Sequence, residues 1–256
     1  MLTRAALIST LASVLIATAP PDRIVDVDGA QIRVRCDGER STGAPVVVLE
    51  AGAGNGAETW SKVQPEIAEF ARVCAYDRPT LVRDKPERPA TPTPSAVVAT
   101  LDAVLTKAGE TPPYVLVGHS LGGMIVRLYA MRFPDKVKGM VLVDSSHEDQ
   151  QRRFAQADPT LVTTEPAATR AEAFDLPAMS AALNADPWHT TIPLVVLSRT
   201  TQSNPMAAIW LDLQRELATR SPRASHVVAE HSGHYIQNDE PALVIDAVRR
   251  VVTSAR

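Results

Sequence analysis

The segment Gly118–Gly122 combines small residues with a single hydroxyl group. Its sequence, Gly-His-Ser-Leu-Gly, follows the apolar run Tyr114–Val117 and precedes a helical pattern. Glycines around a serine at a strand-to-helix turn allow a tight, strained backbone that raises the hydroxyl above a sheet, at the positive end of a helix. The segment therefore indicates Ser120 as a nucleophile for acyl transfer. The alternative is a glycine-rich turn in which Ser120 only caps the helix.

A serine hydroxyl is a weak nucleophile at neutral pH and needs a base beside it. His234 is the best placed of the six histidines, because it follows the apolar run Val227–Ala229 and precedes the last helical pattern. Loops at the carboxyl ends of parallel strands gather at one edge of a sheet. His231 could join His234 in a metal site only with a third ligand, which the sequence does not nominate, so we expect no metal. The other histidines are interpreted as polar fillers or solvent-facing side chains: His119, His147, His189 and His226.

The elements that must position these residues follow from the spacing of apolar residues. Two alternating segments, Arg23–Val27 and Gln31–Cys36, flank Asp28-Gly29 and predict a β-hairpin. Continuous apolar runs of buried parallel strands follow at Val46–Leu49, Val73–Tyr76, Tyr114–Val117, Met140–Val143, Leu194–Leu197 and Val227–Ala229. The alternation with helical stretches predicts an α/β fold, a mostly parallel eight-stranded sheet with helices on both faces.

Helix signals separate these strands. Pro94 opens a stretch with apolar residues on one face that stops at Ala108-Gly109, Asn204-Pro205 opens a second helix, and Glu240-Pro241 opens the last. The polar, proline-rich segment 77–94 predicts an exposed loop. The segment 147–191, with Phe154, Phe174, Met179 and Trp188, is expected to form a small lid whose apolar residues line a pocket or only bury the lid.

The N-terminus and the composition bound the location and the partners. Residues 1–19 combine Arg4, a short apolar run and the ending Ala17-Thr18-Ala19, which predicts a signal peptide and a secreted or periplasmic domain 20–256. The alternative, a membrane anchor, is disfavoured because the run is too short to span a bilayer. With a net charge of −3, the chain has no electrostatic reason to bind nucleic acid. No stable membrane insertion is expected, and the oligomeric state is open.

Cys36 and Cys74 are the two cysteines of the chain, and both lie in predicted strands. An even pair in an exported protein favours a disulfide, which would add about 3 to 5 kcal/mol to stability by closing a long loop. The alternative is two buried thiols that pack as small hydrophobic groups.

Four segments together resemble the α/β-hydrolase superfamily: the hairpin, the turn 49–54, the segment 118–123 and Ser232-Gly233-His234. The resemblance spans nearly the whole mature chain, and it is strongest to exported bacterial hydrolases that combine the segments 74–78 and 143–147 of this sequence, Cys-Ala-Tyr-Asp-Arg and Val-Asp-Ser-Ser-His. It implies a Ser-Asp/Glu-His triad in that chain order. It also implies an oxyanion hole of two backbone amides, those of Leu121 and Ala53, and no metal or organic cofactor.

The sequence departs from the usual pattern of that superfamily at two places. Most members carry the acid after the strand that here is Leu194–Leu197, but residues 198–204 contain no carboxylate. Asp144, which ends the preceding strand, is the expected substitute, with a capping role as the alternative and with Glu148 and Asp149 as weaker candidates. The second departure is at residues 79–84, where many relatives have a glycine-rich turn. Glu50 is expected to pair with Arg78.

These residues predict a serine hydrolase that cleaves a small carboxylic ester through an acyl-enzyme on Ser120. The same residues could act on an amide, a peptide or a lactone, or run a cofactor-free perhydrolase or haloperoxidase reaction. From another class, the fold could be a non-catalytic ligand-binding protein with a vestigial triad. A serine nucleophile disfavours haloalkane dehalogenase and epoxide hydrolase chemistry, where related proteins use aspartate.

Overall fold

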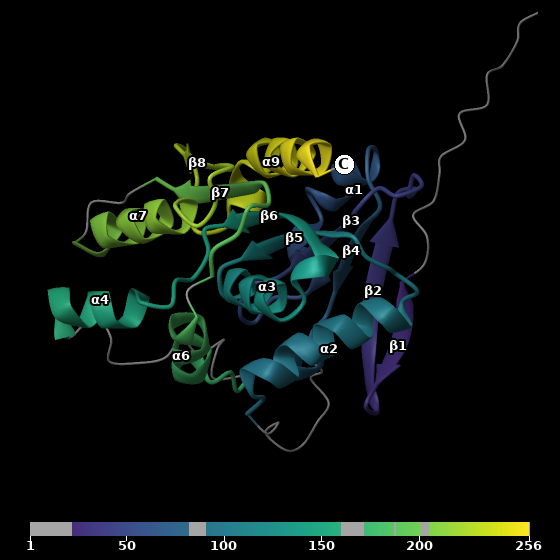
Figure 1. Cartoon of the computed structure of the whole chain (residues 1–256), viewed down its shortest axis with the longest axis horizontal. Helices are drawn as coiled ribbons and strands as arrows, with labels where there is room; N and C mark the ends of the chain where they lie inside the picture. Colours follow the sequence, from purple (N-terminus) through teal and green to yellow (C-terminus); the bar gives the residue numbers. More distant parts are fainter. Residues whose placement is uncertain (1–21, 82–90, 160–171, 187, 201–204, 256) are drawn as a thin grey trace, which may run out of the picture.

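The computed structural model describes residues 22–81, 91–159, 172–186, 188–200 and 205–255, and in them an eight-stranded sheet forms the centre (Figure 1). The strands are ordered β1-β2-β4-β3-β5-β6-β7-β8. Their bounds are β1 Arg23–Val27, β2 Ala30–Asp37, β3 Val46–Glu50, β4 Val73–Tyr76, β5 Tyr114–His119, β6 Val137–Val143, β7 Leu194–Arg199 and β8 Ala224–Ala229. The β1–β2 and β2–β4 pairs are antiparallel and all the others parallel, which confirms the predicted fold class.

Helices cover both faces of the sheet (Figure 1). The helices α2, α3, α6 and α7 lie on one face, and α1 and α9 lie on the other. The helices and short 3-10 turns span η1 Ala57–Trp60, α1 Gln64–Ala68, η2 Pro79–Leu81, α2 Pro94–Lys107, α3 Leu121–Arg132, η3 Pro134–Lys136, α4 Gln150–Ala157, α6 Leu176–Ala185, α7 Pro205–Ala218, α8 Ile236–Asp239 and α9 Pro241–Ser254.

The covering of both faces explains why the strands are continuous apolar runs. Alternate residues of β3 enter two separate clusters: Val46 and Val48 pack under α2 and α3, whereas Val47 and Leu49 pack under α1 and α9. All four side chains are buried, and each contributes roughly 1.5 to 3 kcal/mol relative to exposure. An alternating polar pattern would therefore be incompatible with the central strands.

Local signals fix where the elements begin and end. The hairpin turn holds Asp28 at φ 52° and Gly29 at φ 80°, the left-handed pair that matches the twist of two-residue hairpins. The side chain of Thr93 accepts a hydrogen bond from Ala96 N at 3.2 Å and caps α2. Gly109, at φ 78°, follows the end of that helix. The expected cap at Asn204 lies outside the described residues.

Cys36 and Cys74 are joined by a disulfide between β2 and β4. They are partners in the antiparallel register of these strands, so the bond covalently links the antiparallel hairpin to the parallel part of the sheet. The loop that it closes spans 38 residues, for which the chain-entropy relation gives about 4 kcal/mol of stabilisation.

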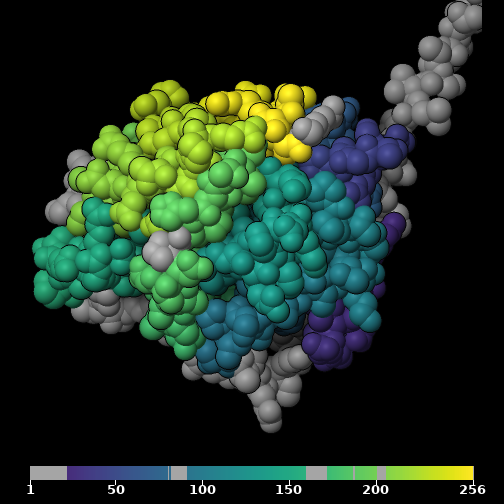
Figure 2. All heavy atoms as spheres, viewed as in Figure 1, coloured from purple at the N-terminus to yellow at the C-terminus, as the bar shows by residue number. Residues whose placement is uncertain are grey.

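Within the described residues of the segment 147–191, α4 packs against α7, and α6 packs against α2 and α3. Phe154 of α4 stacks on Trp210 of α7, with ring centroids 6.4 Å apart, and Figure 2 shows the teal surface of α4 adjoining the yellow-green surface of α7. Met179 of α6 is buried in the same cluster as α3. Residues 160–171 and 187 lie outside the described residues, as does the predicted signal peptide, so a covering function for this segment stays a prediction.

The expectation of an exposed loop over residues 77–94 is wrong at its start. Arg78 is only 3% exposed and Asp77 is half-buried, while residues 82–90 lie outside the described part. A buried guanidinium is tolerated here because carboxylates and carbonyl oxygens accept its hydrogen bonds. In the described part of the chain, each helix is too short or too polar to cross a lipid bilayer.

Candidate active site

Four strand ends meet at the carboxyl edge of the sheet. Ser120 follows β5, Asp144 follows β6, Arg199 ends β7, and His234 lies in the loop after β8. Parallel strands bring their carboxyl ends to one edge, so residues far apart in the sequence become neighbours.

The turn at Ser120 is strained, and its neighbours must be small. Ser120 has φ 52° and ψ −121°, a backbone conformation that residues other than glycine rarely adopt. A Cβ on Gly118 would lie 2.6 Å from the carbonyl oxygen of Gly122, and one on Gly122 would lie 2.3 Å from that of Glu50. The chain therefore folds so tightly at this point that glycine is required at both positions. Asp144 is held at φ 43°, a second strained position.

The structure brings together the three residues that were predicted from separate segments. The Ser120 hydroxyl oxygen lies 3.0 Å from His234 Nε2, and His234 Nδ1 lies 2.6 Å from Asp144 Oδ2. Because an ionised carboxylate can only accept, Nδ1 carries the proton and Nε2 is left to accept one from the hydroxyl. This is the order of contacts that general-base activation of a serine requires.

Asp144 is fully buried and accepts hydrogen bonds from three residues. Besides His234, its oxygens accept from the backbone N–H of Arg199 at 3.1 Å, from Arg199 Nη1 at 2.8 Å and from Trp210 Nε1 at 2.7 Å. Burial raises the pKa of this carboxyl, but the His234 hydrogen bond and the Arg199 charge outweigh it and lower the pKa below its ordinary value. Asp144 is thus held as an anion that orients the imidazole.

Arg199 stands at the strand end where most relatives were expected to place the acid. Its Nη1 lies 3.0 Å from His234 Nδ1. Both nitrogens carry protons, so this proximity reflects their convergence on the same Asp144 oxygen rather than a hydrogen bond between them. The guanidinium lies over the Trp210 ring, 4.7 Å from its centroid.

His119 packs against the other side of His234. Its Nε2 lies 2.9 Å from the His234 carbonyl oxygen, to which it donates. Burial lowers the pKa of His119 to about 3, so it stays neutral at physiological pH. A Cβ on Gly52 would lie 2.8 Å from the His119 ring and 3.2 Å from the Ser120 Cβ. Glycine at position 52 therefore lets the turn after β3 approach the serine.

Two residues from different elements, Ala53 and Leu121, line the same cavity. Leu121 is the first residue of α3, where helix N–H groups lack partners within the helix, and Ala53 lies in the turn after β3. Among the hydrogen bonds of the described residues, the N–H of Ala53 donates to no acceptor. The flanking Gly54 N–H donates to Glu172.

The turn after β3 is held from behind by Arg78. Its guanidinium donates to the carbonyl oxygens of Ala51 at 2.7 Å and Gly52 at 2.6 Å, and to Glu50 at 2.8 Å and Glu172 at 2.8 Å. The expected pairing of Glu50 with Arg78 is confirmed. The role of Glu172 was missed, because nothing in the lid sequence distinguishes this glutamate from the other acidic residues there.

The remaining candidates lie in other environments. Glu148 forms ion pairs with Arg127 and Arg220, and although burial opposes it, the Arg127 charge lowers its pKa to about 2. Asp149 pairs with Arg152 at 2.9 Å. His231 is exposed, as expected.

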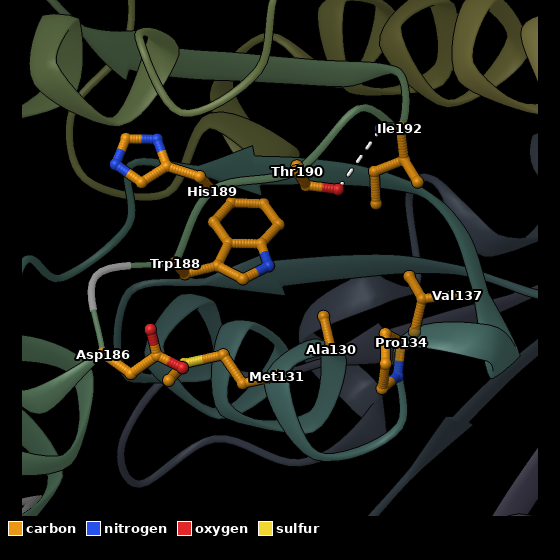
Figure 3. A pocket seen from close by; sticks show the side chains of 9 residues that line it. All are labelled: Ala130, Met131, Pro134, Val137, Asp186, Trp188, His189, Thr190 and Ile192. Carbon is orange, nitrogen blue, oxygen red and sulfur yellow. Dashed lines mark hydrogen bonds between the residues drawn. The ribbon is translucent and has the colours of Figure 1, made fainter.

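A cavity of about 330 Å³ adjoins Ser120 and His234. Its wall includes Ala53 and Leu121, the apolar Leu176 and Trp210, and the polar Asn55, Gln150, Gln151, Ser146 and Arg199. A second cavity of about 450 Å³, shown in Figure 3, is lined by Met131, Trp188 and His189 among others. Met131 lies near the far end of α3, about 15 Å along the axis from Leu121, so this cavity is remote from the serine.

Comparisons with known proteins identify the family to which the fold belongs. The sequence profile of the alpha/beta hydrolase fold matches residues 44–174. The chain is 28% identical over 213 residues to the uncharacterized protein YqjL of Bacillus subtilis, covering 82% of this chain and 84% of that protein.

Two solved structures with similar folds are hydrolases by description. A thermophilic esterase from Thermogutta terrifontis matches with a TM-score of 0.61 and 19% identity over 92% of this chain and 99% of its own. Est816, described as an N-acyl homoserine lactone degrading enzyme, matches with a TM-score of 0.63 and 19% identity over 89% and 99%. At such identities the likeness shows the fold, and the profile leads to one conclusion: the chain belongs to the alpha/beta hydrolase fold family.

Proposed function

We propose that this protein is a serine hydrolase that cleaves small carboxylic esters. The observation that carries the proposal is the hydrogen-bonded series from Ser120 Oγ through both nitrogens of His234 to Asp144, with distances of 3.0 and 2.6 Å. Ala53, whose backbone N–H has no acceptor among the described residues, lines the same cavity as Ser120 and supports the proposal.

In the proposed first step, His234 Nε2 takes the Ser120 proton while the hydroxyl oxygen attacks the ester carbonyl. Asp144 keeps the proton on Nδ1 and stabilises the imidazolium that forms. The N–H groups of Ala53 and Leu121 donate to the oxyanion, and such donors each supply about 3 to 4 kcal/mol of transition-state stabilisation.

The imidazolium then returns its proton to the alcohol oxygen, which leaves and gives the acyl-enzyme. In the second half, His234 takes a proton from water as the water attacks the acyl carbon, and the collapse of the intermediate restores the Ser120 hydroxyl and releases the acid. Each step uses only groups of this chain and water.

We also propose that residues 1–19 form a signal peptide and that the domain works outside the cytoplasm, as in exported bacterial hydrolases. The Cys36–Cys74 disulfide supports this proposal, because such bonds persist in oxidising compartments. Intact-mass measurement of the protein recovered from a secreting host should show a chain that begins at Pro20. A chain that keeps residues 1–19 would contradict cleavage.

The function is tested with p-nitrophenyl esters of increasing acyl length and with a fluorophosphonate probe. We expect hydrolysis and stoichiometric labelling of the parent protein, and loss of both in Ser120→Ala. Ser146→Ala is the matched control, because Ser146 lines the same cavity but its hydroxyl makes no hydrogen bond to a histidine or carboxylate of the described residues. This variant should still be labelled. Labelling without ester turnover would favour an amide or lactone substrate, and the absence of both would favour a non-catalytic binding protein.

A further inference from the structure

The wall of the cavity beside Ser120 carries one guanidinium and no carboxylate among its described residues. Asp144 is completely buried behind it. The other nearby acids are bound to other arginines: Glu50 and Glu172 to Arg78, and Glu148 to Arg127 and Arg220. A negatively charged group that entered the cavity would therefore meet the cation of Arg199 without facing an acidic side chain in the wall.

Arg199 retains hydrogen-bonding capacity beyond its pairing with Asp144. Within the described part of the chain, its polar side-chain contacts all involve Nη1, and its Nε and Nη2 have no acceptor. The side chain is 30% exposed, and its guanidinium is held over the Trp210 ring. A guanidinium fixed in this way loses little conformational entropy when it binds a carboxylate through parallel hydrogen bonds.

The position of Arg199 also indicates which part of an ester it would reach. His234 must return its proton to the leaving oxygen, so the leaving alcohol lies beside His234. Arg199 adjoins His234, and the Trp210 ring stands edge-on to the imidazole, with centroids 6.2 Å apart. The space beside the leaving oxygen thus combines an aromatic surface with a cation.

We infer that Arg199 forms an anion subsite, and that the preferred esters carry a carboxylate on the leaving alcohol. This inference rests on the proposed ester hydrolysis. An interpretation in which Arg199 only neutralises Asp144 leaves its Nε and Nη2 donors and its place in the cavity wall without a role. The subsite makes Arg199 a specificity residue, distinct from the three residues of the proposed triad.

The test compares two acetate esters that differ in charge, those of 4-hydroxybenzoate and 4-hydroxybenzamide. We expect kcat/KM to favour the anionic ester, and Arg199→Met to lower the anionic-to-neutral ratio about tenfold, the usual effect of losing one charged hydrogen bond. Any general loss from disturbing Asp144 affects both esters and cancels in the ratio. Arg199→Lys should keep a large part of the preference, because the charge remains.

Arg152→Met is the matched control, because it removes the same charge from an exposed arginine on α4, the helix that begins at Gln150. It should leave the ratio unchanged. An equal fall in Arg152→Met would contradict a local subsite and point to the net charge of the protein. An unchanged ratio in Arg199→Met, with the acetate ester of 4-hydroxybenzamide still hydrolysed, would contradict the subsite and leave the hydrolase proposal intact.

Binding without turnover separates the two proposals. In Ser120→Ala, titration calorimetry should show tighter binding of 4-hydroxybenzoate than of 4-hydroxybenzamide, and the difference should disappear when Arg199→Met is added. If the parent protein hydrolyses no ester but this difference is present, the proposed function fails and the anion subsite stands. Equal binding of both compounds would overturn the subsite.

Discussion

Two arginine–carboxylate groups flank Ser120, and they differ in burial. The side chain of Arg78 is 4% exposed, and its guanidinium donates to Glu50, Glu172 and the carbonyl oxygens of the turn after β3. Arg199 is 30% exposed, shares Asp144 with His234 and borders the cavity. One arginine is enclosed by its acceptors, whereas the other keeps donors that a ligand can reach.

The difference shows how the same pair of charges serves two purposes. A buried pair is held in place by the cost of leaving either charge unpaired, so Arg78 fixes the backbone that carries the Ala53 N–H. Arg199 is partly solvated, and buried Asp144 accepts further hydrogen bonds from His234, Trp210 and the Arg199 backbone N–H, so the loss of the guanidinium should cost less stability than the loss of Arg78. Arg199 is therefore expected to affect activity and substrate choice more than folding.

The largest expected effect is the fall in kcat when Asp144, the carboxylate partner of Arg199, loses its charge. Asp144→Asn keeps the shape of the side chain but removes the charge that holds the Nδ1 proton, and we expect kcat to fall about 10⁴-fold, as the loss of this acid does in other triads. Burst and steady-state kinetics on a p-nitrophenyl ester measure it. Asp149→Asn is the control, because Asp149 pairs with Arg152 outside the triad, and it should retain activity. Full activity in Asp144→Asn would place the acid elsewhere.

The second prediction concerns the buried group. Arg78→Met removes the guanidinium that pairs with the buried carboxylates of Glu50 and Glu172, so the free energy of unfolding should fall by about 3 to 5 kcal/mol. Urea unfolding followed by circular dichroism measures it. Arg199→Met is the comparison, and its loss should be smaller, about 1 to 2 kcal/mol, because Asp144 keeps its other hydrogen-bond donors. Equal losses in the two variants would contradict the distinction between the groups.

Much of the fold and the centre of the site follow from the sequence, because burial on both faces imposes continuous apolar runs. Ser120, His234 and Asp144 were identified from their places after such runs, and the structure brings them within hydrogen-bond distance. The start of β8 was missed because the strand lies at the sheet edge, where half-exposed residues such as His226 interrupt the apolar run. At edges, polar residues are tolerated and the pattern weakens.

The residues that hold the site in place from outside the proposed triad, Arg78, Glu172 and Arg199, could not be predicted in the same way. The contact between Arg78 and Glu172 joins residues 94 positions apart, and Glu172 lies in a segment without a regular apolar pattern. From the sequence, no carboxylate was found after β7, and no role was assigned to Arg199. Its contacts with Asp144 and Trp210 depend on how β7 and α7 pack, which spacing along the chain does not encode.

The smallest expected effect is the pH dependence that buried histidines confer. Burial lowers the pKa of His147 to about 4, although Glu148 raises it, and Arg127 and Arg220 add to the lowering. Its Nδ1 accepts from the Asp149 N–H at 3.0 Å, as a neutral ring can. In the unfolded chain the His147 imidazole has a pKa near 6.5. The neutral ring therefore contributes fully to the free energy of unfolding above that pH, and this contribution declines as the pH falls toward 4.

Between pH 7.5 and 5.5 this linkage should lower the free energy of unfolding by about 1 kcal/mol for His147, with His119 adding in the same direction. Urea unfolding of the parent and of His147→Gln at both pH values measures the difference, which should shrink in the variant. His189→Gln is the control, because His189 is exposed, and it should keep the slope of the parent. A slope that is unchanged in His147→Gln would mean that His147 binds its proton equally well in the folded and unfolded chain.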